Sequence, residues 1–123
     1  MEKLKAKVRK GKKLTENEQI ELCKLGNEEL IELYCRKHCL LREAEKELIR
    51  QGNLVLLQRY IDKFFYFYAE NAADIVKIAS KEFIKYYINR FYLCEKAQKD
   101  LVELGDDELI RLYEERWWKI KEG

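Results

Sequence analysis

The sequence predicts an all-α protein with about eight short helices, arranged as four stacked αα-hairpin repeats of about 26 residues in a short α-solenoid. Three observations predict this fold class. Apolar side chains recur at helical rather than strand spacing, the chain contains no Pro, and four of its segments align when it is written under itself. A tyrosine holds the same place in every segment, at intervals of 26, 27 and 26 residues: Tyr34, Tyr60, Tyr87 and Tyr113.

The aligned segments define one predicted domain. Its length and its 47% hydrophobic share are enough for a core. With the exceptions of His38 and Glu114, apolar residues follow a fixed glycine or alanine in each segment by 4, 5, 8, 9 and 12 positions, which places them on one face of an α-helix. We predict a single helical-repeat domain over residues 14–123, with repeats at about 14–39, 40–66, 67–92 and 93–118.

Each repeat is predicted to consist of a first helix, a tight turn and a second helix. Gly26, Gly52 and Gly105 suit the left-handed conformation that ends a helix. Thr15 and Glu18 have the spacing of a capping box at the start of the first helix. The residue after the glycine position is in every repeat a good N-cap for the second helix: Asn27, Asn53, Ser80 and Asp106.

The third repeat departs from this pattern. Ala79 stands where the other repeats have glycine, and one extra residue lies near residues 64–71. Because a left-handed alanine costs about 1 kcal/mol, we expect the backbone at Ala79 to avoid that conformation. The turn or the stacking is therefore expected to differ at this junction.

The turn and the residues after it resemble a known class of proteins. Gly26, Asn27, Ile31 and Tyr34 fit the pattern GN-x-x-x-I-x-x-Y, which is similar to short hairpin repeats in uncharacterised bacterial proteins. The wider class of helical-hairpin repeats includes the tetratricopeptide (TPR), HEAT and armadillo arrays, whose units are longer and whose signature residues are missing here. The resemblance covers residues 15–118; it implies a binding scaffold and carries over no catalytic residue.

The composition offers little material for catalysis. The chain has one His, one Ser and one Thr, so nucleophilic and acid–base constellations are scarce. Two carboxylates three positions apart, Asp100 and Glu103, are more often solvated than catalytic. We predict a protein that is not an enzyme and that has no cofactor.

A zinc site is the alternative considered for the cysteines. Cys35, His38 and Cys39 lie within one helical turn, and Cys23 or Cys94 could join them. In the other repeats, however, the three positions hold Ile, Phe, Tyr or Trp, with Glu114 as the one exception. We therefore predict no metal site, and expect these side chains to pack in the core, where free cysteine behaves as a small apolar residue.

Charged residues recur in two rows, which we expect to be solvated faces. The acidic row is Glu21, Glu47, Asp74 and Asp100, each but the last followed three positions later by Lys or Arg. The basic row lies near the ends of the second helices, where cations suit the helix dipole, and it is Lys37, Lys63, Arg90 and Arg116.

Residues 1–13 form a basic N-terminal arm or cap. Seven basic residues against one acidic give it a net charge of +6, while the rest of the chain has a net charge of −4. Such an arm could bind nucleic acid or an anionic membrane, or Leu4 and Val8 could fold it onto the first hairpin. We favour a tail or cap, because no basic stripe continues onto the repeats. The candidate nucleic-acid residues are Lys3, Lys5, Lys7, Arg9, Lys10, Lys12 and Lys13.

A cytoplasmic location is predicted. No run approaches the roughly 18 apolar residues of a membrane-spanning helix, and the first residues contain no apolar stretch typical of a secretory signal. Four cysteines in a chain with its own core require no disulfide framework.

The surplus of aromatic residues suggests the function, because one member of each adjacent pair fills a core position and we expect the other to be partly exposed. Adjacent aromatic pairs cluster near helix ends, and Leu54 and Val55 occupy positions that are charged in the other repeats. Our leading hypothesis is a non-catalytic scaffold for protein–protein interaction or self-association, since interfaces favour Trp and Tyr. The alternative is a nucleic-acid-binding accessory protein that uses the N-terminal arm. The candidate partner surface is Leu54, Val55, Phe65, Tyr92 and Trp118.

Overall fold

The computed structural model describes residues 2–120, and over that range the protein is all-helical, with ten helices and no strand. The all-α prediction is confirmed. The backbone forms two compact units, which divide between Tyr68 and Ala69 and are described one at a time. The predicted single domain and the stacking of the hairpins into a solenoid stay predictions.

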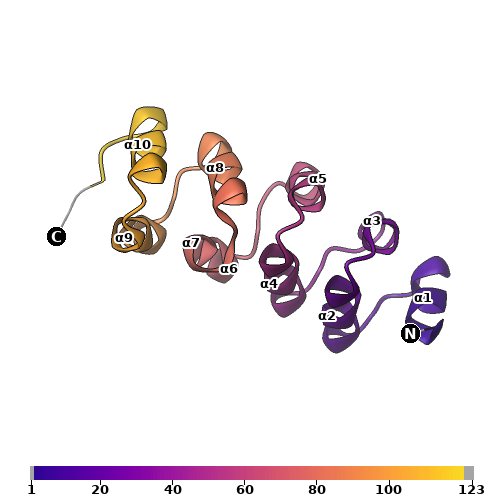
Figure 1. Ribbon diagram of the computed structural model, residues 1–123. Helices are drawn as coiled ribbons and strands as arrows, with labels where there is room; N and C mark the ends of the chain where they lie inside the picture. Colours follow the sequence, from indigo (N-terminus) through magenta and orange to yellow (C-terminus); the bar gives the residue numbers. More distant parts are fainter. Residues whose placement is uncertain (1, 121–123) are drawn as a thin grey trace. The chain divides into compact units, whose positions relative to one another are not determined.

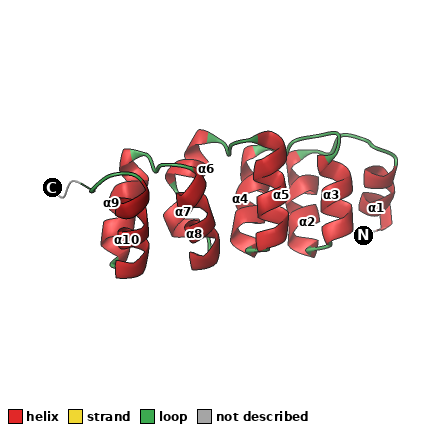
Figure 2. Ribbon diagram, turned by 90° about the horizontal axis from the view of Figure 1, so that it is seen from above, coloured by secondary structure: helices red, strands yellow, loops and turns green. Residues whose placement is uncertain are grey.

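The first unit contains five helices in two rows (Figures 1 and 2). Helix α2 packs against α4, whereas α1 packs against α3 and α3 against α5, so alternate helices lie side by side. The connection from α2 to α3 and that from α4 to α5 are minimal turns. The helices are α1 (Glu2–Arg9), α2 (Glu16–Leu25), α3 (Glu28–Cys35), α4 (Arg42–Gln51) and α5 (Leu54–Phe64).

The second unit has the same alternation. Helices α6 and α7 pack against α9, and α8 packs against α10. The helices are α6 (Ala69–Ala73), α7 (Ile75–Ile78), α8 (Lys81–Arg90), α9 (Glu95–Leu104) and α10 (Asp107–Arg116).

Ten helices replace the predicted eight for two reasons. Residues of the basic arm form α1, whose Leu4 and Val8 are buried. The first helix of the third predicted repeat is broken at Asp74 into α6 and α7. As expected, Ala79 avoids the left-handed region and has φ −90° and ψ 158°.

The predicted helix boundaries are confirmed where glycine is present. Gly26, Gly52 and Gly105 end α2, α4 and α9 with φ of 67°, 71° and 70°. The predicted capping box between Thr15 and Glu18 is present. Side chains of the four predicted N-cap residues accept hydrogen bonds from backbone N–H groups in the first turn of α3, α5, α8 and α10: Asn27, Asn53, Ser80 and Asp106.

The four repeated tyrosines are buried, and the hydroxyl groups of Tyr34, Tyr60 and Tyr113 connect the helices of their pairs. The Tyr34 hydroxyl accepts a hydrogen bond from the Leu14 backbone N–H at 3.1 Å, and the Tyr113 hydroxyl accepts one from Leu93 at 3.2 Å. Leu14 and Leu93 precede α2 and α9, so each bond fixes the second helix of a pair to the start of the first. Burial raises the pKa of both hydroxyl groups, which keeps them neutral.

A buried amide extends this connection in the first unit. The side chain of Gln19 donates to the Leu14 carbonyl at 3.0 Å and to the Tyr34 hydroxyl at 3.1 Å. Its oxygen accepts from the Leu41 N–H at 2.7 Å, just before α4. Gln19 therefore links α2, α3 and the start of the next helix pair.

Glu45 occupies the equivalent position one pair later. It is 1% exposed, accepts from the Tyr60 hydroxyl at 2.9 Å and accepts from the Tyr68 N–H at 2.8 Å. The buried carboxylate thus makes bonds similar to those of Gln19, but the tyrosine now acts as the donor. Burial and the Glu45 charge both raise the pKa of Tyr60, which keeps this donor protonated.

The prediction that the acidic row is solvated is wrong at Asp100. It is 7% exposed, and it has the lysine partners that the sequence pattern did not provide: Lys96 Nζ lies 2.9 Å away and Lys77 Nζ 3.7 Å away. Lys96 also contacts Asp74 at 2.6 Å. The pattern missed these pairs because Lys77 comes from α7 and Lys96 precedes Asp100 by one helical turn.

We predict that Gln19→Ala lowers the free energy of unfolding by about 2–4 kcal/mol, because it leaves several buried backbone and hydroxyl groups without a partner. Glu45→Gln should change it by under about 1 kcal/mol, because glutamine already makes the equivalent bonds at position 19. Urea denaturation followed by circular dichroism measures both. Equal losses for the two variants would contradict the proposed equivalence.

Candidate functional site

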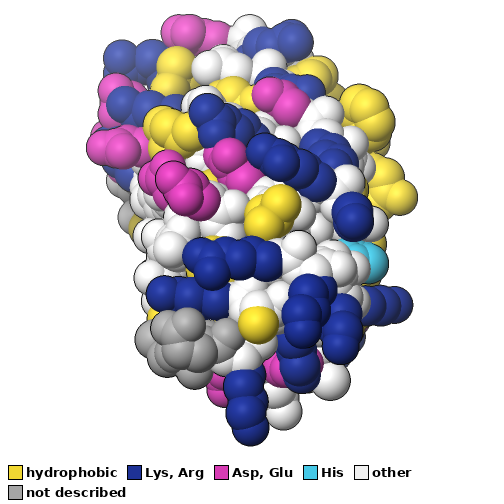
Figure 3. Space-filling view, turned by 90° about the vertical axis from the view of Figure 1, so that its right-hand side faces the viewer, with side chains coloured by type: hydrophobic (Ala, Val, Ile, Leu, Met, Phe, Trp, Pro, Cys, Tyr) yellow, Lys and Arg dark blue, Asp and Glu magenta, His cyan; other side chains and the backbone are white. Residues whose placement is uncertain are grey.

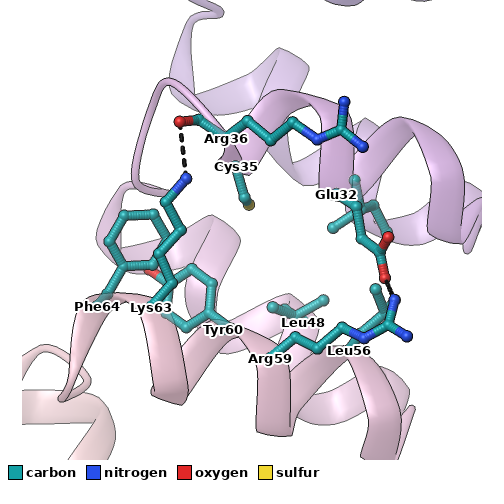
Figure 4. A pocket seen from close by; sticks show the side chains of 10 residues that line it. Glu32, Cys35, Arg36, Leu48, Leu56, Arg59, Tyr60, Lys63 and Phe64 are labelled. Atoms are coloured by element: carbon teal, nitrogen blue, oxygen red, sulfur yellow. Dashed lines mark hydrogen bonds and ion pairs between the residues drawn. The ribbon is translucent and has the colours of Figure 1, made fainter.

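A cavity of about 200 Å³ lies in the first unit, and we call it the α3–α5 groove (Figure 4). Its walls come from facing sides of α3 and α5, and one residue comes from α4. The lining residues are Ile31, Glu32, Cys35, Arg36, Leu48, Leu56, Arg59, Tyr60, Lys63 and Phe64.

The floor of the groove is apolar. Ile31, Leu48 and Leu56 are buried, and the Cys35 sulfur points into the space between the helices (Figure 4). The Tyr60 ring lines the groove, while its hydroxyl is bonded to Glu45. Burial raises the pKa of the Cys35 thiol to about 12, so it remains protonated and acts as a small apolar group.

The rim of the groove is mostly cationic. Arg59 of α5 forms an ion pair with Glu32 of α3, and Lys63 Nζ donates to the Arg36 carbonyl oxygen at 2.7 Å (Figure 4). Arg36, Arg59 and Lys63 therefore surround an apolar floor together with a single carboxylate, Glu32. The side chains of Arg36, Arg59 and Lys63 are exposed.

An exposed aromatic segment follows directly after this groove in the chain. Phe65 is 67% and Tyr66 is 74% exposed, while Phe67 beyond them is buried. Phe65 has φ 71° and is the one non-glycine residue with positive φ between residues 2 and 120. A left-handed conformation costs such a residue roughly 1–2 kcal/mol. Phe65 thus exposes an aromatic ring to solvent in the left-handed conformation that glycine adopts at the ends of α2, α4 and α9.

The candidate partner residues fall into both units. In the first unit, Val55 is 47% exposed, Leu54 is half-buried and Phe65 is exposed. In the second unit, the rings of Tyr92 and Trp118 lie 5.6 Å apart, and both are exposed. The structure therefore describes two separate groups of candidates, one in each unit.

The second group is part of a larger aromatic cluster after α10. Trp118 packs edge-on against the buried Tyr113 at 6.0 Å. The neighbouring Trp117 donates from its indole N–H to the Ile88 carbonyl at 2.7 Å, and Arg116 lies 4.4 Å from its ring. These contacts hold Trp117 against α8, so Tyr92 and Trp118 form the solvent-facing part.

The cysteines and the histidine differ partly from expectation. Cys23 and Cys35 are buried, but the prediction that Cys39 packs in the core is wrong, because α3 ends at Cys35 and leaves Cys39 exposed. His38 is half-buried and its Nε2 lies 3.2 Å from the Gly11 carbonyl oxygen. Within residues 2–120, no three His, Cys, Asp or Glu side chains are grouped to hold a metal ion.

The basic residues near the N-terminus do not all have the same environment. Lys7 forms an ion pair with Glu18 of the capping box, and Lys5 is half-buried. Figure 3 shows Lys and Arg side chains gathered on the face that carries α1. The candidate nucleic-acid residues that are exposed there are Lys3, Arg9, Lys10, Lys12 and Lys13.

The basic row includes contacts that the sequence analysis missed. Lys63 bonds to the Arg36 carbonyl, and Arg116 bonds to the Asn89 carbonyl at 3.2 Å. In both cases the acceptor lies 27 residues earlier, at the end of the preceding second helix. Arg36, Arg59 and Tyr66 are further surface residues that the sequence pattern did not single out; the run of aromatic residues at 64–68 is the one signal that pointed to this region.

Comparison with protein-family models, with curated proteins and with solved structures finds no match for this chain. Among the helices within residues 2–120, none has both the length and the apolar character needed to cross a bilayer.

We predict that Phe65→Gly raises the free energy of unfolding by up to about 1 kcal/mol, because glycine adopts positive φ without strain and the Phe65 ring is mostly exposed. Phe65→Val should lower it, since a β-branched residue tolerates positive φ poorly. Thermal and urea denaturation measure both changes. A loss of stability in Phe65→Gly would show that the ring contributes packing instead.

Proposed function

We propose that this protein is a non-catalytic helical-repeat module that binds a protein partner, or a second copy of itself, through the first unit. The observation that carries the proposal is the exposed, left-handed Phe65 next to the exposed Tyr66. Backbone strain at a surface position is typical of a functional site, and large exposed aromatic side chains are typical of interfaces. The α3–α5 groove adjoins this segment in the chain.

The helical-repeat part of the proposal rests on recurring local structure. The glycine-ended helix followed by a capped helix occurs at three turns, and the tyrosine hydroxyl contacts recur at Tyr34 and Tyr113. Bonds between positions 27 residues apart recur in each unit. We propose that the repeated helix pairs build a short α-solenoid of the HEAT or tetratricopeptide kind.

The proposal includes a cytoplasmic location. All four cysteines are free thiols, and two of them, Cys39 and Cys94, are exposed. Exposed free thiols are more compatible with a reducing compartment than with an oxidising one.

To test the proposal, we would replace Phe65 with Asn and Tyr66 with Ser. Asparagine tolerates positive φ, so the double variant should fold while losing the aromatic surface. Light scattering measures self-association, and quantitative mass spectrometry measures proteins captured from extracts of the source cells. We expect the double variant to lose at least about nine-tenths of the wild-type capture or association, as expected for central aromatic residues.

The matched control is Leu104→Asn, which removes an exposed apolar side chain from α9 in the second unit. It should leave capture and association unchanged. Identical results for wild type, control and double variant would contradict the proposed binding surface.

A second candidate function is nucleic-acid binding through the N-terminal face. The observation that favours it is the exposed group of Lys3, Arg9, Lys10, Lys12 and Lys13 near α1. Phosphate contacts from such residues would make binding strongly dependent on salt.

We predict for this candidate that Lys10→Glu with Lys12→Glu abolishes retention on double-stranded DNA or single-stranded RNA at low salt. Lys99→Glu, an exposed charge change in α9, serves as the control. Electrophoretic mobility shifts over a salt series measure the effect. A wild-type protein that shows no retention even at the lowest salt concentration would exclude this candidate.

A further inference from the structure

We propose that the α3–α5 groove binds an acidic peptide segment of a partner protein, with one apolar side chain of the peptide inserted between the helices. This inference rests on the proposed function and identifies the chemistry of the partner. It depends on three features of the groove: its size, its floor and the charges on its rim.

The size of the groove fits a side chain. Pockets for small-molecule ligands usually have volumes of about 300–1,000 Å³, and this cavity has about 200 Å³. Its floor is formed by Ile31, Leu48, Leu56 and the Cys35 sulfur. A Leu, Ile, Met or Phe side chain can fill such a space and exclude water from it.

The groove exists because of Cys35. The aligned position of the second and third predicted repeats holds Ile61 and Ile88, both of which are completely buried, and the fourth repeat has Glu114 there. A cysteine side chain is smaller than isoleucine, so the space that isoleucine would fill stays open between α3 and α5. The Cys35 sulfur points into that space (Figure 4).

The rim of the groove selects for acidic residues. Arg59 and Lys63 lie one helical turn apart on α5, so they are neighbours on its surface, and Arg36 lies across the groove at the end of α3. The single carboxylate of the lining, Glu32, is already paired with Arg59. Acidic residues of the peptide on both sides of its apolar residue would therefore lie close to cations of the rim. Arginine can bind a carboxylate through two N–H groups.

Nucleic acid fits this groove less well. Phosphate groups could contact the rim, but they offer no apolar group for the floor. A peptide that alternates acidic and apolar residues satisfies both parts.

The test is a selection of peptides from a random library displayed on phage, with the full-length protein as bait. We expect the enriched peptides to be acidic and to share one apolar residue flanked by Asp or Glu. The most enriched peptides are then synthesised with a fluorescent label, and their affinity is measured by fluorescence anisotropy. Replacing their apolar residue with Ser should weaken binding at least about tenfold.

Two variants test the site itself. Cys35→Ile fills the groove with the residue that the chain uses at positions 61 and 88, so the protein should fold with equal or higher stability. Arg36→Glu with Lys63→Glu reverses the rim charge. Both should weaken peptide binding at least about tenfold, whereas Lys24→Glu with Arg50→Glu, a matched change of one lysine and one arginine that do not line the groove, should not.

The outcomes separate the inference from the proposed function. No enrichment on wild type, enrichment of basic peptides, or full binding by Cys35→Ile would overturn the acidic-peptide proposal. If the enriched peptides depend on Phe65 and Tyr66 but not on the groove, the proposed function stands and this inference fails. A wild-type dimer that Cys35→Ile converts to a monomer would show that a second copy occupies the groove, which also overturns the proposal. Circular dichroism confirms that each variant is folded.

Discussion

The buried bonds of the tyrosine hydroxyl groups are the constraint on which the helix pairs depend. Each pair has short helices of eight to eleven residues in the first unit, too short to be stable alone in water. The Tyr34 hydroxyl and the Gln19 amide satisfy backbone groups at the start of α2 and before α4. Because these groups would otherwise be buried without a partner, one bonded cluster sets both the pairing of helices and the position of the next pair.

The residues that stabilise the helix pairs are different from those of the candidate binding surface. The Gln19 and Glu45 contacts lie inside the first unit, and the features assigned to binding lie on its outside. Phe65 has the opposite character, since it combines an unfavourable backbone conformation with solvent exposure. The backbone conformation of Phe65 opposes stability and its ring gains little from burial, which is the reason for proposing a binding role for this residue.

Local chemistry made much of the fold predictable. The capping residues, the left-handed glycines and the buried tyrosines follow from interactions within a few residues or from a fixed helical face. The break at Asp74 and the lysine partners of Asp100 were not predictable in this way, because they depend on which helices meet. The site was only partly predictable: the aromatic run drew attention to Phe65, but neither its positive φ nor the exposure of Tyr66 has a local sequence signal.

The groove shows how a small sequence difference can become a site. Cysteine at position 35 is a conservative replacement for the isoleucine of the second and third predicted repeats, since both residue types are apolar and these side chains are buried. The difference in side-chain size between cysteine and isoleucine matters for packing. A smaller side chain between two helices leaves a cavity unless the helices move closer together. The Lys63 bond to the Arg36 carbonyl and the ion pair of Arg59 with Glu32 connect α3 and α5 across their exposed edges. These polar contacts place the cations around the mouth of the groove, so the same residues that connect the two helices give the cavity its charge.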